Sequence, residues 1–112
     1  MSIGVGAYGT KVSEDDIRAE YSYTSYNLNN KLYRNPEKIE DGLIIINKKA
    51  LAEKENILSE ECIKAGELTI INCSNTWKTF GRYDCAACWL ICKLRRVYLL
   101  NGTFPDSLSF HK

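Results

Sequence analysis

Three of the five cysteines in this 112-residue chain lie within the segment DCAACWLICK, residues 84–93. Cys85 and Cys88 form a Cys-x-x-Cys pair at the expected start of a helix, and Cys92 follows one turn later. The N-terminus of a helix stabilises a thiolate and lowers the pKa of its thiol. One interpretation is therefore a thiol-redox protein that uses Cys85 and Cys88, with Cys85 as the reactive thiol.

A second interpretation of the cysteines is a zinc site. Four thiolates suit a closed tetrahedral zinc centre, and the candidate ligands are Cys62, Cys73, Cys85 and Cys88. Zinc sites usually show two close cysteine pairs, whereas this chain has one. Zinc is therefore an alternative, and the working expectation is that the protein has no cofactor.

The third interpretation, which we favour, is that these cysteines are packing residues. Free cysteine behaves as a small hydrophobic side chain and is often buried. The segment 85–100 is apolar around nearly its whole helical circumference, with polar groups confined to Lys93, Arg95 and Arg96. A helix of this kind is typical of the centre of a core. Asp84 is a good N-cap for it, and Asn101-Gly102 is a good stop.

Other reaction chemistries find little support in the composition. The chain has one histidine, His111, next to its C-terminal residue, which argues against hydrolysis through a histidine base. The net charge of +1 predicts no strong field for nucleic acid or anionic lipid. The sequence thus favours a protein that is not an enzyme.

The remaining segments predict an α+β (or small α/β) fold. Residues 13–35 combine a cap at Ser13 with apolar residues at helical spacing, which predicts a helix ending before Pro36. Residues 43–46 and 67–72 predict strands, and residues 48–66 predict a helix with a break near Asn56. Because a helical segment joins these two strands, a parallel β-α-β unit is one expected arrangement.

The expected domain organisation is a single compact domain over residues 1–112. It contains about three helices, a small two- to three-stranded sheet and a buried C-terminal helix. Residues 1–12 are interpreted as a flexible arm or an edge strand, and residues 103–112 as an irregular tail. No apolar run approaches the ~20 residues that span a bilayer, and no secretory signal precedes the domain. An odd number of cysteines then indicates reduced thiols and a cytoplasmic protein.

The working function is a small protein-binding module that occupies a partner's surface. Inhibitors, immunity proteins and anti-defence proteins are chains of this size, and a homodimer is also compatible. Aromatic and arginine side chains dominate binding hot spots, and exposed amides adapt to a partner. The candidate contact residues lie on the expected first helix and in the loop after residue 72: Tyr23, Tyr26, Asn27, Asn30, Tyr33, Trp77, Phe80 and Arg82.

A further alternative is binding to single-stranded nucleic acid. The Trp77–Tyr83 loop interleaves aromatic and basic residues, and Lys93, Arg95 and Arg96 add positive charge on the last helix. Aromatic rings stack on bases while cations hold phosphates. The sequence pI of about 7.6 argues against this alternative.

Overall fold

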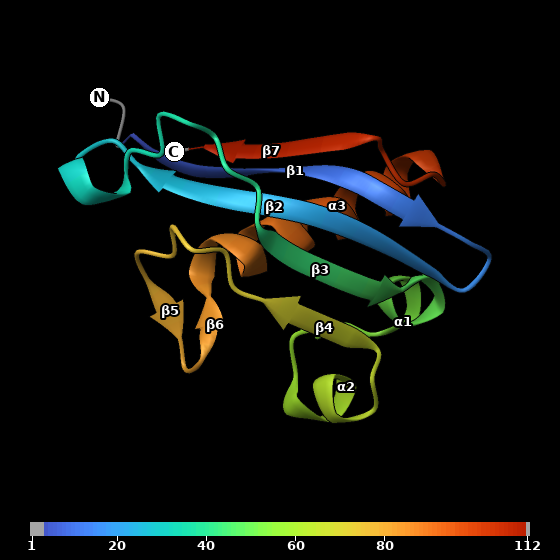
Figure 1. Ribbon diagram of the computed structural model, residues 1–112. Helices are drawn as coiled ribbons and strands as arrows, with labels where there is room; N and C mark the ends of the chain where they lie inside the picture. The colour runs from blue at the N-terminus through green and yellow to red at the C-terminus, as the bar shows by residue number, and fades with distance from the viewer. Residues whose placement is uncertain (1–3, 112) are drawn as a thin grey trace.

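A long antiparallel hairpin forms the centre of the sheet in this computed structural model, which describes residues 4–111. Its strands are β1 (Val5–Glu14) and β2 (Arg18–Asn27). The strand β3 (Gly42–Asn47) pairs with β2, and β4 (Leu68–Ile71) pairs with β3. On the other side, β7 (Ser107–His111) pairs with β1. The result is an antiparallel sheet in the order β4-β3-β2-β1-β7 (Figure 1).

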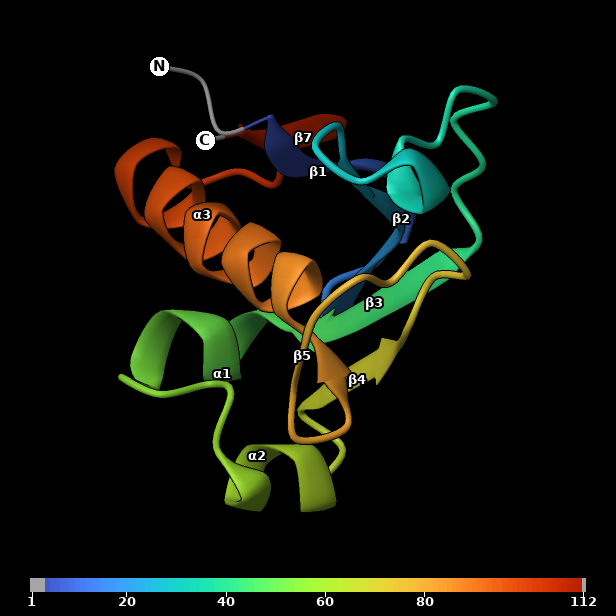
Figure 2. The ribbon, with the colours of Figure 1, turned by 90° about the vertical axis from the view of Figure 1, so that its left-hand side faces the viewer.

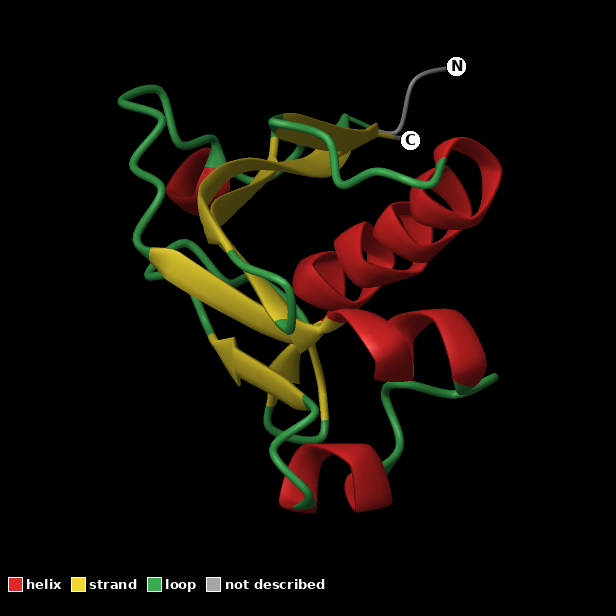
Figure 3. Cartoon of the chain, turned by 90° about the vertical axis from the view of Figure 1, so that its right-hand side faces the viewer, coloured by secondary structure: helices red, strands yellow, loops and turns green. Residues whose placement is uncertain are grey.

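The α-helices lie on one side of this sheet. The long helix α3 (Cys85–Asn101) crosses one face, and α1 (Lys48–Glu53) lies beside it (Figure 2). The short helix α2 (Glu60–Lys64) lies near β4, and a two-stranded hairpin of β5 (Thr79–Phe80) and β6 (Tyr83–Asp84) leads into α3. The loop after β2 carries a 3-10 turn, η1 (Lys31–Tyr33), on the side of the sheet away from α3 (Figure 3). The predicted α+β class and three helices are confirmed, and the main sheet is larger than predicted.

The helix predicted over residues 13–35 is wrong, because most of this segment is β1 and β2. Every second residue of β2 from Ala19 to Ser25 is buried, which is the period of a strand, and Thr24 is buried as well. Ile17 and Leu32, two of the apolar residues at helical spacing in this segment, are 60% and 83% exposed. Asp15 accepts hydrogen bonds from the backbone N–H groups of Ile17 and Arg18, both at 2.8 Å, so it builds the hairpin turn.

The parallel β-α-β arrangement is also wrong. The predicted strands at 43–46 and 67–72 exist as β3 and β4, but they pair antiparallel. The helical segment between them is broken as predicted, and Ser59 begins the second piece by accepting a hydrogen bond from Cys62 N–H. The connection through α1 and α2 returns the chain to the end of β3 that it left, where Asn47 N–H donates a hydrogen bond to the Glu67 carbonyl oxygen at 2.9 Å.

Both terminal segments belong to the sheet. Residues 103–112 were predicted to be irregular, but residues 107–111 form β7. Residues 5–12 form part of β1, which lies between β2 and β7 and is therefore an inner strand, neither an arm nor an edge. Residues 1–3 and 112 lie outside the described residues. A short strand with alternating small polar and apolar residues, SLSFH, is difficult to identify without its pairing partner.

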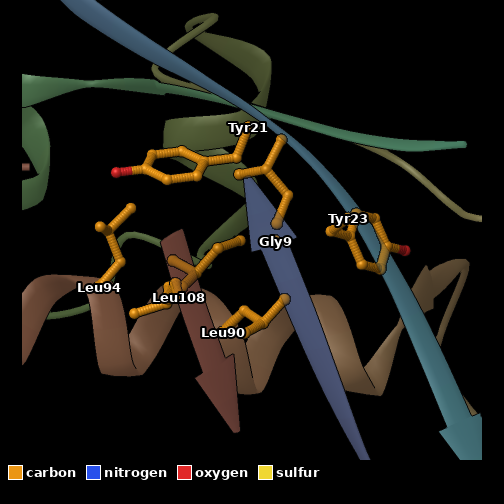
Figure 4. A pocket seen from close by; sticks show the side chains of 8 residues that line it. Gly9, Tyr21, Tyr23, Leu90, Leu94 and Leu108 are labelled. Carbon is orange, nitrogen blue, oxygen red and sulfur yellow. The ribbon is translucent and has the colours of Figure 1, made fainter. Parts of the chain in front are cut away.

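The core lies between α3 and the sheet, where Leu90 and Leu94 face Tyr21 and Tyr23 of β2 (Figure 4). The two tyrosine hydroxyls point in opposite directions along the strand. The Tyr21 hydroxyl donates to the carbonyl oxygen of Pro105 at 2.5 Å. The ring of Tyr23 lies over Gly42, where an added Cβ would approach the ring to 2.2 Å. Gly42 is thus required for close packing of the ring, although its neighbours Glu40 and Asp41 suggest a turn.

Candidate functional site

A buried carboxylate marks the N-terminus of α3. Asp84 is fully buried, and its Oδ1 accepts a hydrogen bond from Ala86 N–H at 2.9 Å, which caps the helix as predicted. Its Oδ2 accepts a hydrogen bond from the Tyr23 hydroxyl at 2.8 Å. Burial, and then the neighbouring Asp84 carboxylate, raise the pKa of Tyr23 far above its ordinary value. Tyr23 therefore remains a donor.

Further polar groups complete this buried cluster. The Thr76 hydroxyl, the Ser25 hydroxyl and the Cys73 thiol lie 3.1, 3.4 and 3.5 Å from the same Asp84 oxygen. The backbone N–H of Cys73 donates to the Tyr23 hydroxyl oxygen at 3.1 Å. These contacts surround the carboxylate with the chain's own donors. Because Asp84, Tyr23, Ser25 and Cys73 are buried and Thr76 is half-buried, the cluster acts as a structural joint between β2 and α3.

The two cysteines of the Cys-x-x-Cys pair are packing residues by position. Cys85 and Cys88 are buried, Cys92 is exposed, and all five cysteines are free thiols. Burial raises the pKa of Cys85, Asp84 adds to the rise, and Lys78 opposes it. Burial, together with neighbouring thiols, raises the pKa of Cys88 to about 11. Both shifts are opposite to those of an activated redox thiol.

The structure does not gather the four proposed zinc ligands. Among residues 4–111 no group of three or more histidine, cysteine, aspartate or glutamate side chains is placed to hold a metal ion. Cys62 donates to the carbonyl oxygen of Asn56 at 3.7 Å, while Cys73 belongs to the Asp84 cluster. Cys62 and Cys73 therefore lie in separate environments.

An apolar groove along α3 is the strongest candidate for a binding site. Its central hollow has a volume of about 280 Å³ and lies between α3, β4, the β5–β6 hairpin and the α2 region. Aliphatic and aromatic side chains line it together with two thiols: Leu58, Ile63, Ile70, Phe80, Tyr83, Cys88, Trp89 and Cys92. Two further hollows adjoin it. One is lined by Trp89, Cys92, Lys93, Arg96, Phe110 and His111, and the other by Glu60, Ile63, Lys64, Arg82 and Tyr83. We call the three hollows together the α3 groove. An apolar concave surface of this kind is typical of binding sites.

Aromatic rings strengthen one side of the α3 groove. Trp89 lies between Trp77 and Phe110, with ring centroids 6.2 and 5.2 Å away. Phe80 projects from the β5–β6 hairpin and is 63% exposed, although it also lines the central hollow. Large apolar side chains that stay exposed beside a hollow favour contact with a partner.

The candidate contact residues from β2 and η1 do not form one surface with this groove. Tyr23 is in the core and offers no contact area, so its assignment to a partner surface is corrected. Tyr26 and Asn27 are half-buried, and the Tyr26 hydroxyl lies 3.2 Å from His111 Nδ1. Asn30 is exposed and caps η1, and the Tyr33 carbonyl oxygen accepts a hydrogen bond from Asn75.

Two of the candidate contact residues after residue 72 line the α3 groove. Phe80 lines the central hollow, and Arg82 lines a smaller hollow beside it. Trp77 is half-buried and packs against Trp89. Leu58, Ile63 and Ile70 also line the central hollow, but they were not identified as contact residues from the sequence. They come beside α3 through the antiparallel return of β4, which was not predicted.

The basic residues proposed for nucleic-acid binding are divided between two sides of α3. Arg95 donates through Nε to the carbonyl oxygen of Leu51 at 3.0 Å, which directs it toward α1. Lys93 donates to the carbonyl oxygen of Ser109 on β7, and Arg96 is exposed. The three cations therefore do not form one strip with the Trp77–Tyr83 segment.

No family model matches the chain, and comparisons with curated proteins and with solved structures give no significant match. Over residues 4–111, none of the helices has the length and apolar character that crossing a membrane requires.

The Asp84 cluster predicts different effects for two tyrosine-to-phenylalanine substitutions. Tyr23→Phe removes a hydrogen bond to a buried carboxylate and should lower the free energy of unfolding by ~1–3 kcal/mol in urea denaturation. Tyr8→Phe is the matched control, because the Tyr8 hydroxyl is buried without a hydrogen-bond partner in the described chain. That control should leave stability unchanged or slightly raised. Equal losses in the two variants would contradict a special role for the cluster.

Burial of Cys88 predicts a loss of stability in alkali. The folded thiol stays protonated up to about pH 11, whereas the unfolded thiol ionises from ~8.5. Ionisation then favours the unfolded chain, so this contribution to stability is present below pH ~8.5 and is lost as the pH rises toward 11. Cys88→Ala should flatten the decline of unfolding free energy between pH ~8 and ~10. An unchanged slope in Cys88→Ala would contradict the prediction.

Proposed function

We propose that this protein is a small, non-catalytic protein-binding module that holds an apolar segment of a partner protein in the α3 groove. It would act by occupying the partner's surface, as inhibitors, immunity proteins and anti-defence proteins do. The observation that carries this proposal is the apolar and aromatic lining of the groove, with Phe80 left 63% exposed at its edge. Aromatic anchors that bury on contact are typical hot spots of protein interfaces.

The chemistry of the groove supports binding over catalysis. The polar side-chain groups that line its central hollow are the thiols of Cys88 and Cys92, the hydroxyl of Tyr83 and the indole N–H of Trp89. Burial raises the pKa of Cys88, which keeps this thiol protonated at neutral pH. An activated nucleophile needs a neighbouring base or a lowered pKa, and this lining supplies neither.

The free thiols support a reducing compartment. Disulfides persist in oxidising environments, and all five cysteines of this chain are unpaired. We therefore place the proposed binding activity in the cytoplasm.

The test is selection of peptides from a random display library, followed by measurement of their dissociation constants by fluorescence anisotropy. Phe80→Asp introduces a charge at the edge of the groove and should weaken the selected peptides by ~10-fold or more. Ile17→Asp is the matched control, because Ile17 is 60% exposed in the β1–β2 turn, at the other end of the molecule (Figure 1). This control should bind normally.

Two outcomes would contradict the proposal. One is that no peptide is enriched on the wild-type protein. The other is that the selected peptides bind Phe80→Asp and Ile17→Asp equally well. Circular dichroism spectra of both variants establish that each retains its fold, since both altered side chains are largely exposed.

A further inference from the structure

The α3 groove is longer than its apolar centre. A hollow of about 260 Å³ adjoins the central one and shares Trp89 and Cys92 with it. At the other end, a hollow of about 140 Å³ shares Ile63 and Tyr83 with the centre. The shared lining residues thus place the three hollows next to one another, in the order α2 region, apolar centre, β7 end. An elongated groove suits a chain segment better than a compact small molecule.

Positive charge is concentrated at the β7 end. Lys93, Arg96 and His111 line this hollow together with the rings of Trp89 and Phe110, and none of its lining residues among residues 4–111 is acidic. The Lys93 ammonium donates one hydrogen bond to the carbonyl oxygen of Ser109, which positions it beside β7. An ammonium has three donors, so further donors remain for a ligand.

The α2 end carries a weaker positive charge. Lys64 and Arg82 line this hollow, and Glu60 is the acidic residue beside them. The guanidinium of Arg82 lies 6.0 Å from the centre of the Tyr83 ring. A cation held near an aromatic face at the edge of a hollow is well placed to meet a carboxylate.

The cations of the groove are not neutralised by ion pairs within the described part of the chain. The ion pairs found over residues 4–111 join Lys11 and Lys48 to Glu14, and Lys11 to Asp106. They lie near the Glu14 end of β1, away from the groove. The groove thus combines an apolar centre with cations at both ends that form no ion pair within residues 4–111.

Resting on the proposed function, we propose that the partner segment is amphipathic, with apolar residues at its centre and acidic residues on both sides. Carboxylates would lie near the cations at each end, where water still reaches them, and apolar side chains would fill the centre. Complementary charge at an interface rim sets specificity and the rate of association. The dominant electrostatic contact is expected at the β7 end, because the described residues that line this hollow include the cations Lys93 and Arg96 and no carboxylate.

The test uses three synthetic peptides with the same apolar centre, taken from a selected binder. Aspartate, asparagine or lysine residues flank this centre on both sides. Fluorescence anisotropy should show that the acidic peptide binds most tightly and the basic peptide least tightly, with a difference of ~10-fold or more at low salt. Added salt should reduce this difference, because it screens exposed charges.

Charge reversal at the β7 end distinguishes a direct contact from a general charge effect. Arg96→Glu should weaken the acidic peptide and strengthen the basic one. Arg18→Glu is the matched control, because Arg18 is also exposed but lies on β2 at its start, next to the β1–β2 turn. This control changes the net charge equally and should leave the order of the peptides unchanged.

The outcomes separate this inference from the function on which it rests. Equal binding of the three peptides, or equal effects of the two charge reversals, would overturn the acidic segment while apolar binding stands. A complete lack of binding would overturn both. Sedimentation of the unliganded protein as a dimer that Phe80→Asp dissociates would replace the partner segment with a second copy of this chain.

Discussion

The structure depends on one buried interaction, the hydrogen bond between the Tyr23 hydroxyl and the Asp84 carboxylate. A buried carboxylate is costly unless donors surround it, and here they come from β2, from the loop after β4 and from the first turn of α3. The interaction therefore fixes the start of α3 against the middle strand of the sheet. Since Cys88, Trp89 and Cys92 follow within two turns, the same interaction positions one wall of the α3 groove.

A single residue without a side chain makes this arrangement possible. The ring of Tyr23 covers Gly42 on the neighbouring strand, and no other residue leaves room for it. The ring then reaches across β3 and presents its hydroxyl to Asp84. Close packing on the sheet and a helix cap are thus linked through one tyrosine.

Local signals in the sequence were sufficient for some elements and insufficient for others. The final helix, with Asp84 as its cap and Gly102 as its end, follows from short-range chemistry and was predicted correctly. Segment 13–35 contains apolar residues at helical spacing and also the alternating stretch YSYTSY. This stretch forms a strand because its buried side chains pack against α3. The groove forms because β4 returns antiparallel beside β3, which is a long-range pairing that local sequence signals do not indicate. Phe80 and Arg82 were identified from the sequence as contact candidates, whereas Ile70 and Trp89 were not.

The position of β7 has a consequence for how the chain folds. Its partner is β1, so Thr10 pairs with Ser107 and Gly6 with His111, across nearly the whole chain. Pairing between such distant segments is slow, because the intervening chain must close a long loop first. Until β7 arrives, one edge of β1 has unpaired backbone groups, and such edges recruit other chains. Newly made protein therefore passes through a stage in which the exposed edge of β1 can pair with another chain.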